Sequence, residues 1–220
     1  MVQETYVVGQ GGPPLQLTLM DQYFRYLAFD VDIPGYDWRI FDFGADLPLL
    51  EPMHQILDPV RGDVSEFAAA GGKLLIYQGW GDVAQSPYRT IEYYQALRRR
   101  HGRHLADHAR LFLAPGMYHC NGGTGPNTFD ALTALERWVE AQEPPASIIA
   151  AHTFGPGTNR TRPLCPYPEH AVYLGQGSID EAANFVCGCP AGSPGEEDGC
   201  DREHHHVRSH DHGSEWSRHP

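Results

Sequence analysis

The stretch "GGKLLIYQGWGD", residues 71–82, places a short apolar run between glycines. An uninterrupted apolar run of this length is typical of a strand that is buried on both faces of a parallel sheet. A second run of the same kind, "ARLFLAPG", occupies residues 109–116. The two runs predict neighbouring strands of an α/β fold.

An amphipathic segment follows each predicted strand. "SPYRTIEYYQALRRRHG", residues 86–102, starts with a serine that can cap a helix and a proline suited to the first turn, and it ends with glycine. "NTFDALTALERWVEAQ", residues 127–142, predicts a second helix. The residues expected to face the sheet are Ile91, Tyr94, Leu97, Phe129, Leu132, Leu135 and Trp138. Strand, helix, strand and helix in this order predict a right-handed parallel crossover unit.

The two ends of the chain differ from this middle part. Residues 1–65 alternate aromatic residues with Asp and Pro and show no sustained helical period, which predicts an irregular segment that wraps around the domain. Residues 188–220 are rich in Gly, Pro and His and hold few large apolar side chains. Since burial there cannot offset the entropy of ordering, we expect a disordered, His-rich tail. The sequence therefore predicts one domain over residues 1–187 and a tail over residues 188–220.

Charge and hydropathy restrict the possible partners. The formal net charge is −12, from 28 acidic and 16 basic residues, so the chain would repel nucleic acid and anionic membranes. No stretch approaches the roughly 20 consecutive apolar residues that span a bilayer. The first residues, "MVQETYVVGQGG", lack the charged start and apolar run of a secretion signal. We therefore expect neither a nucleic-acid nor a membrane partner.

Polar side chains follow the two predicted strands at the points where they end. Asp82 lies just beyond the first strand, and His119 just beyond the second. Since reacting groups gather at the carboxyl ends of parallel strands, Asp82 and His119 match the second half of the Ser, Asp, His order of α/β-hydrolases. Asp82 would orient the imidazole, and His119 would carry the proton of the nucleophile. A lone Asp in a turn or a lone His in a loop is more commonly structural, so the spacing leaves both interpretations open.

Three longer motifs carry a family resemblance. They are "GGKLLIYQGWGD" with the later proline and "IEYY", "RLFLAPGMYHCNGGTGPNTFDALTALERWVE", and "RTRPLCPYP". In this order they closely resemble the C-terminal portion of the tannase and feruloyl esterase family, a group of serine esterases that includes the mono(2-hydroxyethyl) terephthalate hydrolases. The resemblance runs from about Phe24 to Cys187. It implies that residues 1–187 form a partial α/β-hydrolase fold, with the C-terminal strands and helices of its parallel sheet.

The resemblance also implies roles for site residues. The catalytic acid of the family falls on Asp82 and its catalytic histidine on His119, which implies hydrolysis of aromatic-acid esters through an acyl-serine intermediate. Many members have histidine where this chain has Gln78, a departure that leaves both assignments intact. The calcium site of the family lies in a lid domain that is absent here, so we expect no cofactor in this chain.

Cysteine usage fits the same resemblance. The count of five is odd and leaves one thiol over. The C-terminal disulfide of the family matches Cys165 with Cys187, which would close a loop of about 20 residues and contribute about 3 kcal/mol. Cys120 matches the cysteine that, in the family, forms a clasp with a cysteine beside the nucleophilic serine. The partner of that clasp would be absent from this chain.

The nucleophile is expected to be absent as well. No G-x-S-x-G motif occurs; the nearest match, around Ser193, lies in the predicted tail, and Ser86 is better explained as a helix cap. We therefore expect a fragment that supplies the acid and the histidine, is inactive alone, and has the missing N-terminal part of the same hydrolase as its partner. The family implies secretion or a periplasmic location.

Three further features allow two interpretations each. In the tail, a metal-binding role without catalysis is an alternative function: Zn, Cu or Ni could bind His204, His205, His206, His210, His212 and Cys200. No structural zinc spacing supports it, so we predict no specific metal site. Arg160 and Arg162 could bind an anion but are expected to pin their segment to the domain. Trp80 could contact an aromatic substrate but is expected to pack beneath the loop of Asp82.

Overall fold

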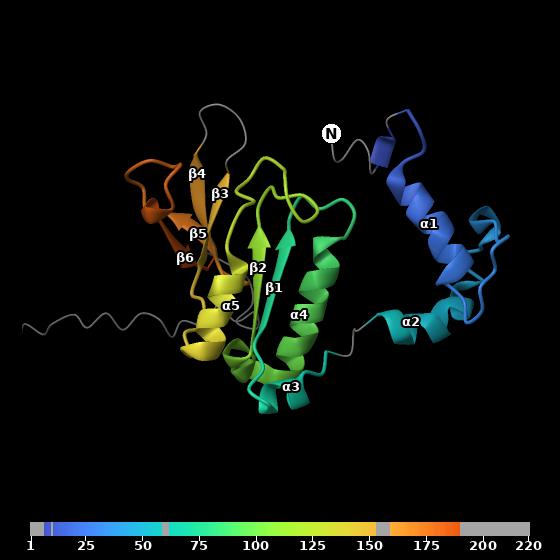
Figure 1. Ribbon diagram of the computed structural model, residues 1–220, viewed down its shortest axis with the longest axis horizontal. Helices are drawn as coiled ribbons and strands as arrows, with labels where there is room; N and C mark the ends of the chain where they lie inside the picture. Colours follow the sequence, from blue (N-terminus) through green and yellow to red (C-terminus); the bar gives the residue numbers. More distant parts are fainter. Residues whose placement is uncertain (1–6, 10, 59–61, 153–158, 190–220) are drawn as a thin grey trace, which may run out of the picture.

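The computed structural model describes residues 7–9, 11–58, 62–152 and 159–189 (Figure 1). Apart from Gly188 and Cys189, the predicted tail lies outside the described residues, and so do all the side chains considered for metal binding there. Among the described residues, no helix is long and apolar enough to cross a membrane.

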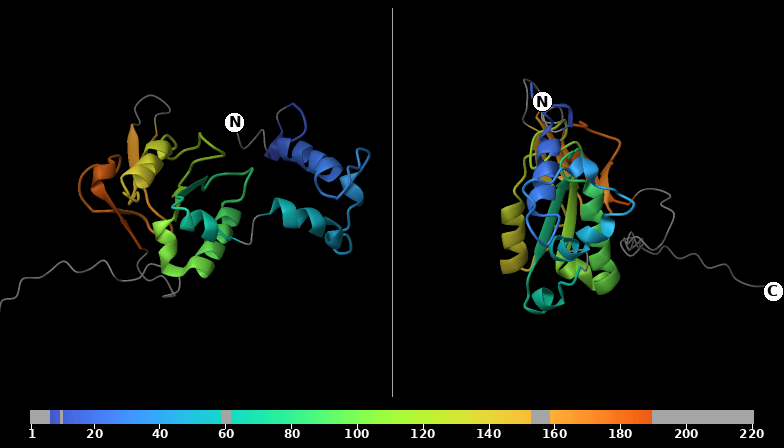
Figure 2. Two further views of the ribbon diagram at one scale, coloured as in Figure 1. Left: turned by 60° about the horizontal axis from the view of Figure 1, so that its bottom comes forward. Right: turned by 90° about the vertical axis from the view of Figure 1, so that its right-hand side faces the viewer.

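A parallel strand pair forms the centre of the molecule. β1 (Leu74–Gly79) runs parallel to β2 (Ala109–Ala114), with Leu74 opposite Ala109 and Gly79 opposite Ala114. α4 (Pro87–His101) connects the two strands, and α5 (Ala131–Glu140) follows β2. The two helices lie on opposite sides of the strands (Figure 2). The predicted parallel crossover is therefore confirmed.

The first turn, the end and the buried face of helix α4 agree with the sequence prediction. Pro87 stands in its first turn, and Gly102 ends it with a φ of +58°, a conformation that suits glycine. Its buried residues are Pro87, Ile91, Tyr94 and Leu97, the last three of which pack with Leu105, Ala109 and Leu111 in one apolar cluster. Ser86 occupies the cap position, but its side chain makes no capping hydrogen bond. The helix is thus held by its apolar face rather than by its N-terminal serine.

One residue of helix α5 that the sequence predicts to face the sheet is exposed instead. Trp138 is buried and lies under the cations of Lys73 and Arg110, at 5.7 and 5.6 Å from the ring centroid. Leu132, by contrast, is 65% exposed, so its predicted burial is wrong. Steps of three residues drift round a helix by about 60° each, because a turn takes about 3.6 residues. Positions 132 and 138 therefore lie on different faces.

Beyond α5, two antiparallel strand pairs form what we call the C-terminal layer, residues 148–152 and 159–188. β3 (Ile148–His152) pairs with β4 (Arg160–Leu164). β5 (His170–Tyr173) pairs with β6 (Phe185–Gly188). The layer lies beside β2 in Figure 1, and Phe112 of β2 bridges to it at Pro166.

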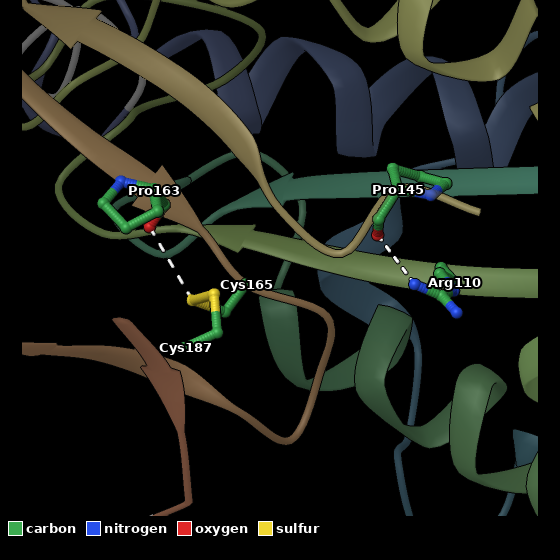
Figure 3. Close-up of a disulfide and its surroundings, with 5 residues drawn as sticks. All are labelled: Arg110, Pro145, Pro163, Cys165 and Cys187. Atoms are coloured by element: carbon green, nitrogen blue, oxygen red, sulfur yellow. Dashed lines mark hydrogen bonds between the residues drawn. A yellow bond between two sulfur atoms is a disulfide. The ribbon is translucent and has the colours of Figure 1, made fainter. Parts of the chain in front are cut away.

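A disulfide joins the two strand pairs of this layer. Cys165 follows β4 and bonds to Cys187 in β6, across a sequence separation of 22 residues (Figure 3). This is the pairing that the family resemblance implies. Near it, the guanidinium of Arg110 in β2 donates a 2.8 Å hydrogen bond to the carbonyl of Pro145, at the entrance to the layer (Figure 3).

The two arginines of β4 make contacts inside the layer. Arg160 Nε lies 2.7 Å from Asp180 Oδ1, and the guanidinium of Arg162 lies 3.7 Å from the ring centroid of Phe185. Both partners belong to the C-terminal layer itself, so the prediction that Arg160 and Arg162 pin their segment to the rest of the domain is wrong: the contacts of these two side chains hold the layer together internally.

The N-terminal segment contains helices that the sequence pattern does not predict. α1 (Leu15–Tyr26) carries an ion pair between Asp21 and Arg25, 2.8 Å apart and one turn from each other. Its apolar residues first alternate and then cluster, which hides the helical period.

The other helical elements of the described chain are short. They are η2 (Trp38–Ile40), η3 (Leu47–Leu50), α2 (Glu51–Leu57), α3 (Ser65–Ala69), η4 (Gly102–Asp107) and η5 (Ala182–Asn184).

An aromatic cluster stabilises this segment separately from the central strands. Phe24 of α1 packs against Ala28 and Phe41, and all three are buried. Phe24 also stacks on Tyr36, with 5.7 Å between ring centroids. The chain between these rings is irregular, but the prediction of an irregular segment over residues 1–65 is wrong where the helices stand.

Candidate active site

The carboxylate of Asp82 is the centre of the site, in the loop after β1 that we call the acid loop (residues 80–86). Its Oδ1 accepts hydrogen bonds from the backbone N–H groups of Ala84 (2.8 Å) and Gln85 (2.9 Å). Its Oδ2 accepts from Gln78 Nε2 (2.8 Å) and from His119 Nδ1 (2.9 Å). Both oxygens are therefore fixed, and the contact between Asp82 and His119 that the strand exits predict is present.

The charge of this carboxylate follows from its surroundings. The Asp82 side chain is only 2% exposed, and this burial raises its pKa. The hydrogen bonds from Gln85, His119, Ala84 and Gln78 act in the opposite direction and prevail, so the pKa lies below its ordinary value. An ionised carboxylate can only accept, so His119 carries its hydrogen on Nδ1 and leaves Nε2 as the basic nitrogen.

His119 belongs to a tightly folded loop, the histidine loop (residues 115–125). Met117 and Gly123 form an antiparallel bridge across it, and Thr124 N–H donates to the carbonyl of Gly116 at 2.9 Å. Gly123 has a φ of +95°, and a Cβ there would lie 1.9 Å from the Gly116 carbonyl oxygen. Only glycine fits this position, so the glycine-rich sequence after His119 serves to close the loop.

The acid loop and the histidine loop touch directly. Gly81 N–H donates to the carbonyl of Met117 at 2.8 Å, and Trp80 N–H donates to the carbonyl of Ala114 at 3.0 Å. A Cβ on Gly79 would lie 2.5 Å from the Met117 carbonyl oxygen. The absence of a side chain at Gly79 thus lets the two loops approach, which brings the carboxylate and the imidazole together.

A pocket opens beside the pair, and the His119 side chain is 34% exposed. None of the described residues that line it is a serine. The lining residues are Tyr77, Gln78, Gly79, Asp82, Gln85, Met117, His119 and Cys120. Cys120 is an exposed free thiol in the described part of the chain. Within that part, no group of three or more His, Cys, Asp or Glu side chains is placed to hold a metal ion.

The sequence-based prediction for Trp80 is wrong. Its side chain does not pack beneath the acid loop but is 40% exposed, and its ring lies edge-on to Tyr88, with 5.8 Å between centroids. Trp80 follows the end of β1, directly after the strand face that carries Gln78, whose side chain bonds to Thr90 of α4. That face points toward α4, and Tyr88 at the start of α4 meets the ring.

Gln78 is the site residue that the sequence did not identify as a partner of Asp82. It is the polar residue at the end of an otherwise apolar strand, four positions before the acid. A polar side chain on a buried strand needs a hydrogen-bond partner, and this requirement is the signal that could have identified it. By contrast, Cys165 and Cys187 lie in the C-terminal layer, outside the set of residues that lines the pocket.

The parallel strands, their flanking helices and the acid–histidine contact at the strand exits define a partial α/β-hydrolase fold. The model of the family "Tannase and feruloyl esterase" matches residues 24–188. The chain therefore belongs to the tannase and feruloyl esterase family, a family of ester hydrolases.

Known proteins of this kind are similar over much of the chain. It is 46% identical over 132 residues to the mono(2-hydroxyethyl) terephthalate hydrolase of Piscinibacter sakaiensis, which covers 58% of this chain and 22% of that protein. It is 33% identical over 208 residues to an esterase of Xanthomonas campestris, covering 77% of this chain and 36% of that protein. The crystal structure of an esterase from Aspergillus oryzae superposes with a TM-score of 0.70 and 27% identity, over 85% of this chain and 40% of that one. The chain thus spans between 22% and 36% of the length of these two curated relatives.

Proposed function

We propose that this chain supplies the acid and the base of a Ser-His-Asp triad that hydrolyses carboxylic esters. The observation that carries the proposal is the 2.9 Å contact between Asp82 Oδ2 and His119 Nδ1 at the exits of two neighbouring parallel strands. Family membership supports it, because the tannase and feruloyl esterase family consists of ester hydrolases. The absence of a side chain at Gly79 lets the two loops approach, and this approach supports the contact between Asp82 and His119.

In the proposed reaction His119 Nε2 takes the proton of a serine hydroxyl as its oxygen attacks the ester carbonyl. Collapse of the tetrahedral intermediate breaks the ester bond, and the imidazolium returns the proton to the leaving alcohol. Water then hydrolyses the acyl-serine by the same proton transfers in a second half-reaction. Asp82 stays ionised throughout, holds the imidazole in the Nδ1–H tautomer and stabilises its charged form.

The nucleophilic serine is proposed to come from sequence beyond these 220 residues, together with the lid. Two observations support this: none of the described residues that line the pocket is a serine, and the chain spans only part of its relatives. Within the described chain β1 pairs only with β2, so its other edge can pair with the strands of that further part. Cys120 is an exposed free thiol next to His119, which supports the proposal that it forms the clasp disulfide with that further part.

An ester of an aromatic acid is the substrate class that we propose. The name of the mono(2-hydroxyethyl) terephthalate hydrolase supports this class, and so does the description of the family. No cofactor bound by this chain takes part in the proposed steps. The disulfide between Cys165 and Cys187 supports a proposed secreted or periplasmic location, since such bonds persist in oxidising compartments.

A segment exchange tests the proposal. Residues 24–188 replace the matching segment of the Piscinibacter sakaiensis hydrolase, and hydrolysis of methyl ferulate and mono(2-hydroxyethyl) terephthalate is measured. The exchanged protein should turn over ester, and its His119→Ala variant should lose about 10⁴-fold or more in kcat. His104→Ala, which changes an exposed histidine outside the pocket, is the matched control and should retain full activity.

Two results would contradict the proposal. If the exchanged protein hydrolyses ester and His119→Ala leaves the rate unchanged, His119 is not the base. If the 220-residue chain alone hydrolyses ester and His119→Ala abolishes this, the nucleophile lies inside the chain.

A further inference from the structure

The side chain of Gln78 connects three elements at the candidate site. Its Nε2 donates to Asp82 Oδ2 at 2.8 Å and lies 3.4 Å from the carbonyl oxygen of Gln85, so it reaches both the acid and its loop. Its Oε1 accepts a hydrogen bond from the hydroxyl of Thr90 in α4 at 3.2 Å. The amide therefore has partners at both ends, on the acid loop and on the helix.

We infer that Gln78 is a positioning residue that holds the Asp82 carboxylate in line with His119. The inference extends the proposed function, since positioning matters to the reaction only if Asp82 and His119 act as the acid and the base.

The hydrogen bonds to each carboxylate oxygen show why a further donor is useful. Backbone N–H groups of Ala84 and Gln85 hold Oδ1, so this oxygen does not depend on any side chain. Oδ2 is held by Gln78 and by the imidazole of His119. The imidazole changes its charge in each proposed half-reaction, whereas the amide is neutral at every pH. Gln78 thus provides the constant contact that keeps Oδ2 in place.

The same contact affects how the proton is shared between the pair. A donor to Oδ2 stabilises the ionised carboxylate and makes it a weaker base. The proton between Asp82 and His119 then stays on Nδ1 of the imidazole. Thr90 contributes by holding Oε1, which orients the amide so that Nε2 and not Oε1 meets the acid.

A purely structural role is the competing explanation. In that case Gln78 would only join β1 to α4 through Thr90, and its loss would change the free energy of unfolding without affecting Asp82. The titration of the Asp82 carboxyl separates the two explanations. Among the described residues, His119 is the titratable side chain that contacts this carboxylate. Neither explanation changes the contact between His119 and Asp82.

The experiment uses the 220-residue chain with ¹³C-labelled aspartate, in which the Asp82 carboxyl is titrated by NMR. Gln78→Met has a similar shape but no donor, and it should raise the pKa of Asp82 by about 1 pH unit. Gln95→Leu is the matched control: this α4 glutamine donates to the hydroxyl of Tyr167, at 3.1 Å, and its loss should leave the Asp82 titration unchanged. An unchanged Asp82 titration in folded Gln78→Met would overturn the inference.

A second variant covers the case in which Gln78→Met does not fold. Thr90→Val keeps the amide but removes the hydroxyl that orients it. A rise of the Asp82 pKa in Thr90→Val supports the inference, and no change overturns it. Because the titration needs no turnover, it gives its answer even if the segment exchange produces no esterase, so failure of the inference and failure of the proposed function are distinguishable.

Discussion

The two loops at the ends of β1 and β2 and the C-terminal layer are held together in different ways. The acid loop and the histidine loop direct three hydrogen bonds at one carboxylate, Gln78 of β1 adds a fourth, and the loops touch through glycine backbone. The C-terminal layer relies on a disulfide, a cation over an aromatic ring and paired strands. Hydrogen bonds orient one side chain in the first region, whereas the disulfide, the ring contact and the strand pairing hold the backbone of the second region. Substitutions should therefore separate the two effects.

Loss of the disulfide should have the largest effect on stability. The double variant Cys165→Ser with Cys187→Ser should lower the free energy of unfolding by about 3 kcal/mol, because the bond restricts a long loop of the unfolded chain. The Asp82 titration should not change. Urea unfolding followed by circular dichroism measures the first effect, and Cys120→Ser, at an exposed free thiol, is the matched control.

A shift of the Asp82 pKa in the disulfide-free protein would contradict the independence of the two regions, because the C-terminal layer would then act on the site. Full retention of stability would show that the layer does not depend on its covalent bond.

Removal of the Asp82 charge should have the next largest effect, and the effect should depend on pH. Asp82→Asn should lower the free energy of unfolding by about 2 kcal/mol at pH 7, because buried donors lose their charged acceptor. Since the folded-state pKa of Asp82 lies below its ordinary 3.8, the contribution of the charge is complete above that value and is lost as the pH falls through the folded pKa.

Urea unfolding of the wild type and of Asp82→Asn at several pH values between 7 and acid conditions tests this. The difference in stability between the two proteins should shrink below about pH 4. A difference that grows on acidification would show that the charge is not stabilised by the acid loop.

The exposed ion pair of the C-terminal layer should have the smallest effect. Arg160 and Asp180 have side chains that are 37% and 45% exposed, so water screens their attraction. Arg160→Met should therefore cost less than about 1 kcal/mol and leave the Asp82 titration unchanged. A loss comparable to that of the disulfide would mean that this pair, and not the covalent bond, holds the layer.

The central strands and the pair at their ends could be predicted from local sequence. The apolar runs between glycines indicate β1 and β2, and parallel strands end at the same edge, which places Asp82 beside His119. The helix α4 is equally local, since its apolar spacing and flanking residues lie within one segment. The disulfide of Cys165 came from the family resemblance, because residue spacing alone does not select a partner.

Contacts between distant segments could not be predicted in this way. Alternation along β1 assigns Gln78 to a face, but it does not show that Thr90 of α4 completes its hydrogen bonds. Helix α1 depends on the packing of Phe24 against Phe41, which lies far along the chain. The exposure of Leu132 depends on where the face of α5 falls, and a spacing of three residues does not determine it.

The tautomer of His119 in the 220-residue chain tests whether Asp82 orients this imidazole as a base. Long-range ¹H–¹⁵N NMR of the neutral ring measures which nitrogen carries the hydrogen. We expect the Nδ1–H form in the wild type and its loss in Asp82→Asn. A wild-type ring with its hydrogen on Nε2 would rule out His119 as the base, because that nitrogen could not accept the proton of a serine.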